Sequence, residues 1–181
     1  MAETEAEPTV PEGYPSDLES TVVLGDGSAV SFRPILPEDG TEIARAYAEA
    51  DADTLFHRFF TAAPNIGEKQ INYLSEVDYQ RRLALVALDE DGHGVGIARY
   101  ESLTDSTRAE VAVVVHADWR RRGIATELLG RLEDPARRRG IAELIAVYLP
   151  ENRAVAAVFE RLGYSSPRLA DGLARVEKRI A

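Results

Sequence analysis

The residues best suited to chemistry lie in one continuous stretch, from Glu110 to Thr126. An apolar run, Val111 to Val115, leads through a short polar turn to three arginines, then to Gly123 and a helical pattern that begins near Ile124. This order predicts a strand, a turn and the start of a helix. The first N–H groups of a helix have no partner within the helix and lie at its positive end, so they can hold a diphosphate. Glycine lets the backbone come close to such a ligand because it has no Cβ.

Composition narrows the possible classes of protein. The chain has 181 residues, 45% of them hydrophobic, which suits one compact domain with an extension. It has no cysteine, which excludes disulfides, thiolate metal sites and a cysteine nucleophile. The three histidines lack the spacing of metal ligands, so we expect no metal. There is neither a long apolar run nor the pattern of a secretion signal, so we expect a cytoplasmic protein without a membrane partner.

The charge of the chain is strongly acidic. The formal net charge is −10, and Lys69 and Lys178 are the two lysines. Such a surface repels nucleic acid unless a basic patch is segregated, so we expect no nucleic-acid partner. Two explanations of the acidity remain open: adaptation to a salty cytoplasm, or a preference for basic partners.

The first half of the chain predicts an extension, a hairpin and helices. Residues 1–18 are acidic, rich in proline and poor in apolar residues, which predicts a disordered leader before a domain over residues 19–181. Apolar runs around Gly and Asp turns predict strands, and 3.6-residue periodicity predicts helices. The expected strands cover 21–24, 29–35, 82–88, 95–100 and 108–116, and the expected helices cover 37–50, 54–60 and 68–76.

The second half predicts one crossover and a closing pair of strands. The helix from Ile124 contains Pro135, which should kink or end it. The next strand, 144–149, is reached through this helix, which favours a parallel partner. A helix then runs from 151 to 162, ended by Gly163, and segments 164–166 and 174–180 form an antiparallel pair. The expected fold is α/β (α+β), with a mixed, mostly antiparallel sheet.

At Arg120, Gly123 and Ala125 the chain resembles the GNAT superfamily of acyl-CoA-dependent N-acyltransferases. The acetyl-CoA signature of that family is Gln/Arg-x-x-Gly-x-Gly/Ala, between the fourth strand of the fold and the next helix. A second family element, Asn152, Phe159 and Gly163-Tyr164, follows the next strand. The resemblance implies a GNAT fold with six to seven strands, splayed in the middle and flanked by about four to five helices.

A more specific resemblance lies upstream. Phe32 to Ile35, Phe56 to Phe60, Glu76 to Tyr79 and Ala109 to Ala112 look like the GNAT domains of bacterial and archaeal protein-lysine acetyltransferases of the Pat type. In that group such domains modify acyl-CoA synthetases. The similarity covers roughly residues 20–181 and implies a protein lysine as acceptor.

The resemblance also implies the roles of individual residues. The N–H groups of residues 121–126 should hold the diphosphate of acetyl-CoA, the co-substrate, and the arginine side chains can add charge-assisted bonds. The backbone of strand residues 113–115 should bind pantetheine as an added strand would. The expected acetyl-CoA site contains Val113, Val114, Val115, Arg120, Arg121, Arg122, Gly123, Ile124, Ala125, Thr126, Asn152 and Phe159.

For the base that deprotonates the amine, the resemblance indicates Glu110, at the start of an apolar strand where partial burial would raise the pKa of its carboxyl. The alternative is a structural glutamate that pairs with Arg108 or Arg99. Many family members use a tyrosine as general acid where this chain has Phe159, which leaves Tyr164 or water. Asn152 can bind pantetheine or cap its helix.

These residues favour acetyl-CoA-dependent N-acetylation of a protein lysine by direct attack in a ternary complex. His57 and Arg58 lie where family members line the acceptor channel. Two alternatives remain: acetylation of a small amine or antibiotic, and a non-catalytic sensor that binds acyl-CoA. We expect a monomer or a homodimer.

Overall fold

The computed structural model describes residues 10–59, 66–104 and 107–181. In these residues eight strands form one sheet in the order β1-β2-β3-β4-β5-β6-β8-β7. All neighbouring strands are antiparallel except β5 and β6, which are parallel. The strands are Ser20–Val23 (β1), Ala29–Pro34 (β2), Arg82–Leu88 (β3), Gly94–Ser102 (β4), Arg108–Val115 (β5), Glu143–Tyr148 (β6), Arg168–Ala170 (β7) and Leu173–Arg179 (β8).

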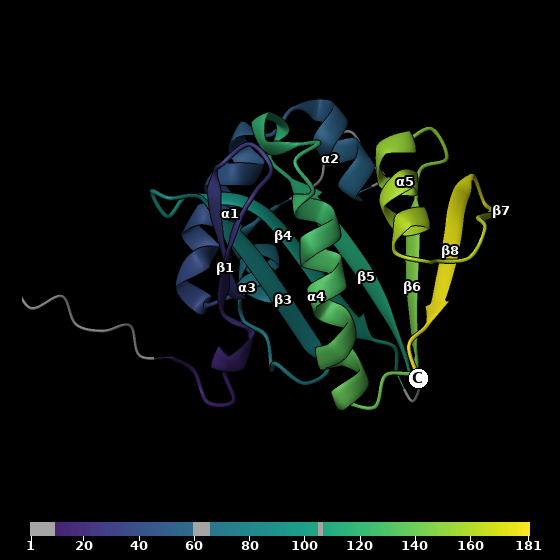
Figure 1. Cartoon of the computed structure of the whole chain (residues 1–181), viewed down its shortest axis with the longest axis horizontal. Helices are drawn as coiled ribbons and strands as arrows, with labels where there is room; N and C mark the ends of the chain where they lie inside the picture. The colour runs from purple at the N-terminus through teal and green to yellow at the C-terminus, as the bar shows by residue number, and fades with distance from the viewer. Residues whose placement is uncertain (1–9, 60–65, 105–106) are drawn as a thin grey trace, which may run out of the picture.

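Helices cover both faces of the sheet (Figure 1). The α-helices are Gly40–Glu49 (α1), Ala52–Phe59 (α2), Glu68–Ser75 (α3), Ile124–Arg138 (α4) and Arg153–Arg161 (α5), and short 3₁₀ helices cover Ser16–Leu18, Pro37–Asp39 and Ala117–Trp119. On β4, Gly96 faces α4, whereas the next residue, Ile97, packs with Ile43 of α1. Because side chains alternate along a strand, α4 and α1 lie on opposite faces. None of the helices in the described part of the chain is both long and apolar enough to cross a membrane.

The packing of α4 fixes the start of the motif that the sequence indicates. Ile124, Leu128, Leu129 and Leu132 recur on one face of this helix and are all buried. A Cβ on Gly96 would lie 3.1 Å from Ile124 and 3.2 Å from Leu128. The glycine therefore allows the first turns of α4 to lie close against β4, which places the helix N-terminus beside the end of β5.

The sheet opens between β5 and β6, as the resemblance implies. These strands pair over Arg108 to Glu110 and Glu143 to Ile145, and no pairing between them is found beyond this point. β5 remains paired with β4 up to Val115, while β6 remains paired with β8. In Figure 1 the two strands meet near the C-terminus of the chain and separate towards α5. Each strand is thus held on its outer side, which keeps the gap open.

Part of the predicted leader is packed onto the domain. Residues 1–9 lie outside the described residues, but Ser16–Leu18 form a 3₁₀ helix. The Tyr14 ring makes an edge contact with Tyr79, at 5.7 Å between centroids, and Leu18 packs against the core. In this described part of the predicted leader, two of the few apolar side chains therefore reach the core.

The closing hairpin begins later than predicted. Ser165 bonds to β8 as predicted, since its N–H donates to the carbonyl of Glu177 at 2.8 Å and its Oγ accepts the N–H of Glu177 at 3.1 Å. The regular strand before the turn is nevertheless Arg168–Ala170. Asp171 and Gly172 between β7 and β8 both have positive φ, 52° and 78°. This tight two-residue turn pairs the residues directly before it, and the short β7 raises the number of strands to eight.

The other local predictions mostly hold. The helix of Pro135 does not end there but continues to Arg138, because proline in the last turn removes only one helical N–H bond. Asp51 caps α2, since its carboxylate accepts the N–H of Thr54 at 2.6 Å. The last residue of the predicted helix 54–60, and the residues after it up to 65, lie outside the described residues.

Candidate active site

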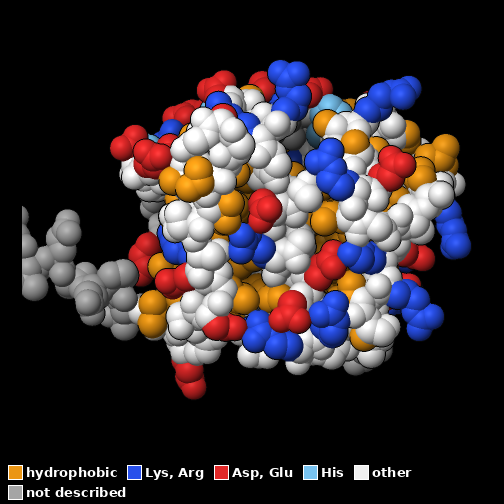
Figure 2. Space-filling model, in the orientation of Figure 1, with side chains coloured by type: hydrophobic (Ala, Val, Ile, Leu, Met, Phe, Trp, Pro, Cys, Tyr) orange, Lys and Arg blue, Asp and Glu red, His pale blue; other side chains and the backbone are white. Residues whose placement is uncertain are grey.

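A cleft of about 820 Å³ occupies the gap between β5 and β6. It is lined by residues of α2, β5, the N-terminal end of α4, the end of β6 and α5. With one exception, Arg122, every residue predicted for the site lines this cleft. In Figure 2, acidic and basic side chains are interspersed along the upper edge of the molecule.

The turn before α4 presents a series of unpaired N–H groups. Arg121 and Gly123 both have positive φ, 62° and 88°. Within the described residues, the N–H groups from Arg121 to Thr126 donate to no partner, and the first helical bond is from the N–H of Glu127 to the carbonyl of Gly123. Successive unpaired N–H groups at a helix N-terminus form an anion-binding concavity. A Cβ on Gly123 would meet nothing within 4 Å, so glycine is needed here for its backbone conformation.

The three arginines have different surroundings. Arg120 reaches back across the cleft, where Nη2 donates to Oγ1 of Thr54 at 2.7 Å. Arg122 turns away to the β1–β2 turn, where it pairs with Asp26 at 3.0 Å and lies over the ring of Trp119. The side chain of Arg122 therefore lies outside the cleft, because Asp26 offers an opposite charge there. The Arg121 side chain is exposed and lines the cleft.

Strand β5 offers a free backbone edge to the cleft. The N–H of Leu103 donates to the carbonyl of Arg108, and the N–H of His116 donates to the carbonyl of Val95. Arg108, at the start of β5, and His116, directly after its end, therefore bond towards β4. Bonding alternates along an antiparallel pair, so the N–H and C=O of Val113 point away from β4. Since the pairing with β6 stops at Glu110, these groups face the gap. The amides of an extended ligand could pair with this edge.

Glu110 lies at the narrow end of the cleft, where β5 and β6 stop pairing. Its side chain is exposed, which corrects the expectation of partial burial. Within the described part of the chain it forms no ion pair, and Arg99, one of its expected structural partners, donates instead to the carbonyl of Leu74 at 3.0 Å. The carboxylate is therefore accessible from the cleft.

The helix after β6 supplies a cap and an aromatic wall. Asn152 accepts the N–H of Val155 at 3.2 Å, which is the capping role, and it also lines the cleft. Phe159 lies between the rings of Tyr148 and Tyr164, with centroids 5.8 and 4.9 Å away. Burial raises the pKa of the Tyr164 hydroxyl, and this residue is absent from the cleft wall. Tyr164 is thus poorly placed as a proton donor to the cleft.

Several residues of the wall were not predicted. Tyr148, at the end of β6, lines the cleft, and burial raises the pKa of its hydroxyl. Thr54 and Asp53 of α2 also line it, next to His57 and Arg58, which the resemblance indicates for the acceptor side. An apolar strand that ends in tyrosine looks like ordinary core in a sequence, so nothing local marks Tyr148 as a site residue.

A small group of possible metal ligands lies away from the cleft. Asp89, Asp91 and His93 have ligand atoms within 4.8 Å of one another in the turn between β3 and β4. The Asp89 carboxylate already accepts the N–H groups of both other residues. This arrangement is accounted for by the turn, and the expectation of no metal stays a prediction.

Comparisons with known proteins agree with this geometry. Residues 44–164 match the model of the Acetyltransferase (GNAT) family. The chain is 31% identical over 161 residues to acetyltransferase PA5475 of Pseudomonas aeruginosa, covering 87% of each protein. It is 32% identical over 145 residues to acetyltransferase Pat of Mycolicibacterium smegmatis, which covers 78% of this chain and 43% of that protein.

A solved structure extends the similarity to the whole fold. The GNAT domain of S. lividans PAT superposes with a TM-score of 0.85 and 30% identity, over 92% of this chain and 99% of that domain. The open sheet, the cradle of N–H groups and the family match lead to one conclusion. The chain belongs to the GNAT family of acetyltransferases and is an N-acetyltransferase.

Proposed function

We propose that this chain transfers the acetyl group of acetyl-CoA to the ε-amine of lysine residues in proteins, by direct attack in a ternary complex. The observation that carries this proposal is the course of β5 through the cleft. The strand joins an exposed carboxylate, Glu110, to the unpaired N–H groups from Arg121 to Thr126. Base and anion cradle therefore stand at opposite ends of one free strand edge.

The residues fit acetyl-CoA in two places. The diphosphate would be held by the N–H groups from Arg121 to Thr126, with the Arg121 guanidinium beside it. The pantetheine amides would pair with the edge at Val113. Acetyl-CoA supplies an activated acetyl thioester when bound, and the chain orients it against the acceptor.

Glu110 is the proposed general base. A lysine ammonium must lose a proton before its nitrogen can attack, and an accessible carboxylate at the end of the cleft can accept that proton directly or through one water. Phe159 has no hydroxyl, and Tyr164, the other candidate, does not line the cleft. We therefore propose water as the proton source for the leaving group.

The proposal of a protein acceptor rests on similarity to the Pat proteins. The chain spans 43% of the length of the M. smegmatis protein, so substrate and regulation of that larger protein are not carried over as such. By the resemblance of its sequence motifs, we propose acyl-CoA synthetases as the class of acceptor, and the cytoplasm as the compartment.

The experiment incubates the purified chain and radiolabelled acetyl-CoA with a cell extract and, in parallel, with a panel of small amines. We expect label in protein bands, on lysine by mass spectrometry, and labelling at least about a hundredfold slower when the Glu110→Gln variant replaces the wild type. Label confined to small amines would overturn the protein acceptor. Tight binding of acetyl-CoA without transfer to either class would instead support the sensor alternative.

A further inference from the structure

A second cavity, of about 160 Å³, lies under α1 on the face of the sheet that is turned away from α4. It is bounded by α1, the start of α2 and the paired strands β4 and β5. Thr54, Val114, Val115 and Ala117 belong to the walls of both cavities. The second cavity therefore adjoins the acetyl-CoA cleft but has walls of its own.

Arg99 is the cation of this second cavity. It lies in the middle of β4 and is half-buried. One nitrogen, Nη2, donates to the carbonyl of Leu74 at the end of α3, at 3.0 Å. Within the described residues no carboxylate pairs with Arg99, although a guanidinium has five N–H donors. Burial, and then the charge of Arg58, lower the pKa of Arg99 to about 10, so it remains a cation at neutral pH.

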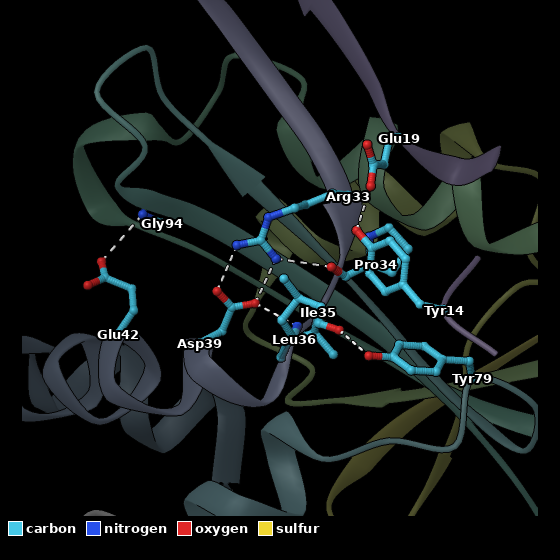
Figure 3. A network of polar contacts seen from close by, with 10 residues as sticks. All are labelled: Tyr14, Glu19, Arg33, Pro34, Ile35, Leu36, Asp39, Glu42, Tyr79 and Gly94. Carbon is cyan, nitrogen blue, oxygen red and sulfur yellow. Dashed lines mark hydrogen bonds and ion pairs between the residues drawn. The ribbon is translucent and has the colours of Figure 1, made fainter. Parts of the chain in front are cut away.

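The acidic side chains of the same wall have other partners. Asp39 makes two bonds of 2.8 Å to Arg33, and Glu42 accepts the N–H of Gly94 (Figure 3). Arg45 pairs with Glu42 at 2.5 Å and with Glu49 at 2.8 Å.

The carboxylate of Asp51 is also occupied, because it caps α2 through the N–H of Thr54. Of the two arginines that line this cavity, Arg99 is therefore the one that forms no salt bridge in the described chain, and Glu101 acts on its charge only from a distance.

The rest of the wall is largely apolar. Ile43, Ala46 and Tyr47 of α1 face Val86 and Ile97 of the sheet around the cavity. Removing a cation from water without an opposite charge is costly. A pocket that keeps such a cation beside apolar walls is suited to a small anion with an apolar tail.

We propose that this cavity binds a small monocarboxylate, with its carboxylate on the Arg99 guanidinium and its hydrocarbon part against α1. Arg–carboxylate pairs are commonly bidentate, and the donors that Leu74 leaves free can supply the two bonds. The site is distinct from the proposed diphosphate cradle, which lies at the N-terminus of α4. The proposal does not depend on the identity of the acetyl acceptor.

The test uses the full chain, without and with saturating CoA, and the probes sodium butyrate and sodium benzoate. Their neutral isosteres butyramide and benzamide, and sodium chloride at equal ionic strength, serve as reference ligands. Calorimetry and thermal melting should show saturable binding of the carboxylates, at roughly millimolar Kd for ligands of this size. Binding of the amides should be at least about tenfold weaker, since they lack the charge. CoA should leave the carboxylate Kd nearly unchanged.

Two arginine variants separate a binding role from a structural one. Arg99→Met should abolish carboxylate binding, and Arg99→Lys, which keeps the charge but loses the fork, should weaken it. The matched control is Arg82→Met, because Arg82 also donates to carbonyls at the end of α3, those of Tyr73 and Glu76, yet lies outside this cavity. It should bind carboxylates as the wild type does.

Several results would overturn the proposal. They are equal binding of amides and carboxylates, binding that persists in Arg99→Met, loss of binding in Arg82→Met, or displacement by CoA. Circular dichroism verifies that each variant is folded. If Arg99→Met does not fold, an unchanged carboxylate Kd in Arg99→Lys overturns the proposal, and a raised one supports it.

Discussion

Glu101 and Glu110 stand directly opposite each other in the antiparallel pair of β4 and β5. Their side chains therefore leave the same face of the sheet. The carboxylate of Glu101 is held by Tyr73, whose hydroxyl donates to both oxygens at 2.5 Å and whose ring lies 3.8 Å from the guanidinium of Arg82. Glu110 has no such partner in the described chain and lines the cleft. Two like charges on neighbouring strands thus differ in role: one is fixed and the other is accessible.

This difference predicts unequal effects of removing the two charges. Glu110→Gln should lower kcat by about 10² to 10⁴-fold, the usual contribution of a general base, and leave the Kd of acetyl-CoA nearly unchanged. Glu101→Gln, its matched control, keeps an oxygen for the Tyr73 hydroxyl and should retain most of the turnover. Steady-state kinetics and calorimetry measure both quantities. An unaltered kcat in Glu110→Gln at neutral pH would rule out its role as base.

The second prediction concerns the left-handed backbone at Gly123. The Cβ of an alanine there would meet no neighbouring atom, so the substitution is unfavourable only because of the positive φ of 88°. Relaxation of that φ would move the N–H groups of residues 121–126, the cradle for the diphosphate. We expect the KM of acetyl-CoA to rise about tenfold, the equivalent of one lost hydrogen bond to a charged group. Gly140→Ala is the control, with φ of 81° and no atom within 4 Å. It should lose a similar amount of stability with an unchanged KM; equal KM effects in both variants would contradict the cradle.

The third prediction compares neighbouring arginines. Arg121→Gln should raise the KM of acetyl-CoA and make it less dependent on salt, because this exposed guanidinium lines the cleft. Arg122→Gln should change KM little, since its side chain pairs with Asp26 away from the cleft. Kinetics at low and high ionic strength distinguish them. A larger effect from Arg122 than from Arg121 would show that the arginines rearrange when the ligand binds.

The fourth prediction is a loss of stability in alkali through Tyr100. Burial raises the pKa of this hydroxyl from 10.0 to about 12, and it donates to the carbonyl of Gln80 at 3.0 Å. The folded state holds the proton of Tyr100 more tightly than the unfolded state does. The contribution of this hydroxyl to the unfolding free energy is therefore complete below pH 10 and is lost as pH rises towards 12. The difference in unfolding free energy between wild type and Tyr100→Phe should therefore shrink above pH 10.

Denaturant titrations between pH 8 and 11 measure that difference, starting about two units below the unfolded pKa of 10.0. Arg99 has a lowered pKa in the folded state, so its effect on the unfolding free energy is opposite: stability rises when this group loses its proton at high pH. Because Arg99 is present in both proteins, its effect cancels in the difference between them. A difference that stays constant over this range would show that Tyr100 does not titrate differently in the folded and unfolded states.

Much of the backbone was predictable because it depends on local patterns. The apolar run before Gly123 and the helical spacing after it gave the strand, the turn and the start of α4 within a residue or two. The Asp51 and Asn152 caps also follow from neighbouring residues, since each side chain bonds an N–H three positions ahead. The hairpin before β8 was misplaced, although its Asp171–Gly172 turn is itself a local signal.

The sequence by itself determined the type of site: a strand, a glycine with positive φ and a helix N-terminus make an anion cradle wherever they occur together. Only the tertiary structure decided which side chains serve it. The Arg122 side chain lies outside the cleft because it pairs with Asp26, 96 residues away in the chain. The Arg120 side chain remains in the cleft wall because it donates to the hydroxyl of Thr54. Glu110 is accessible because β6 parts from β5 one step later. Such pairings depend on the packing of distant segments, and no spacing along the chain encodes them.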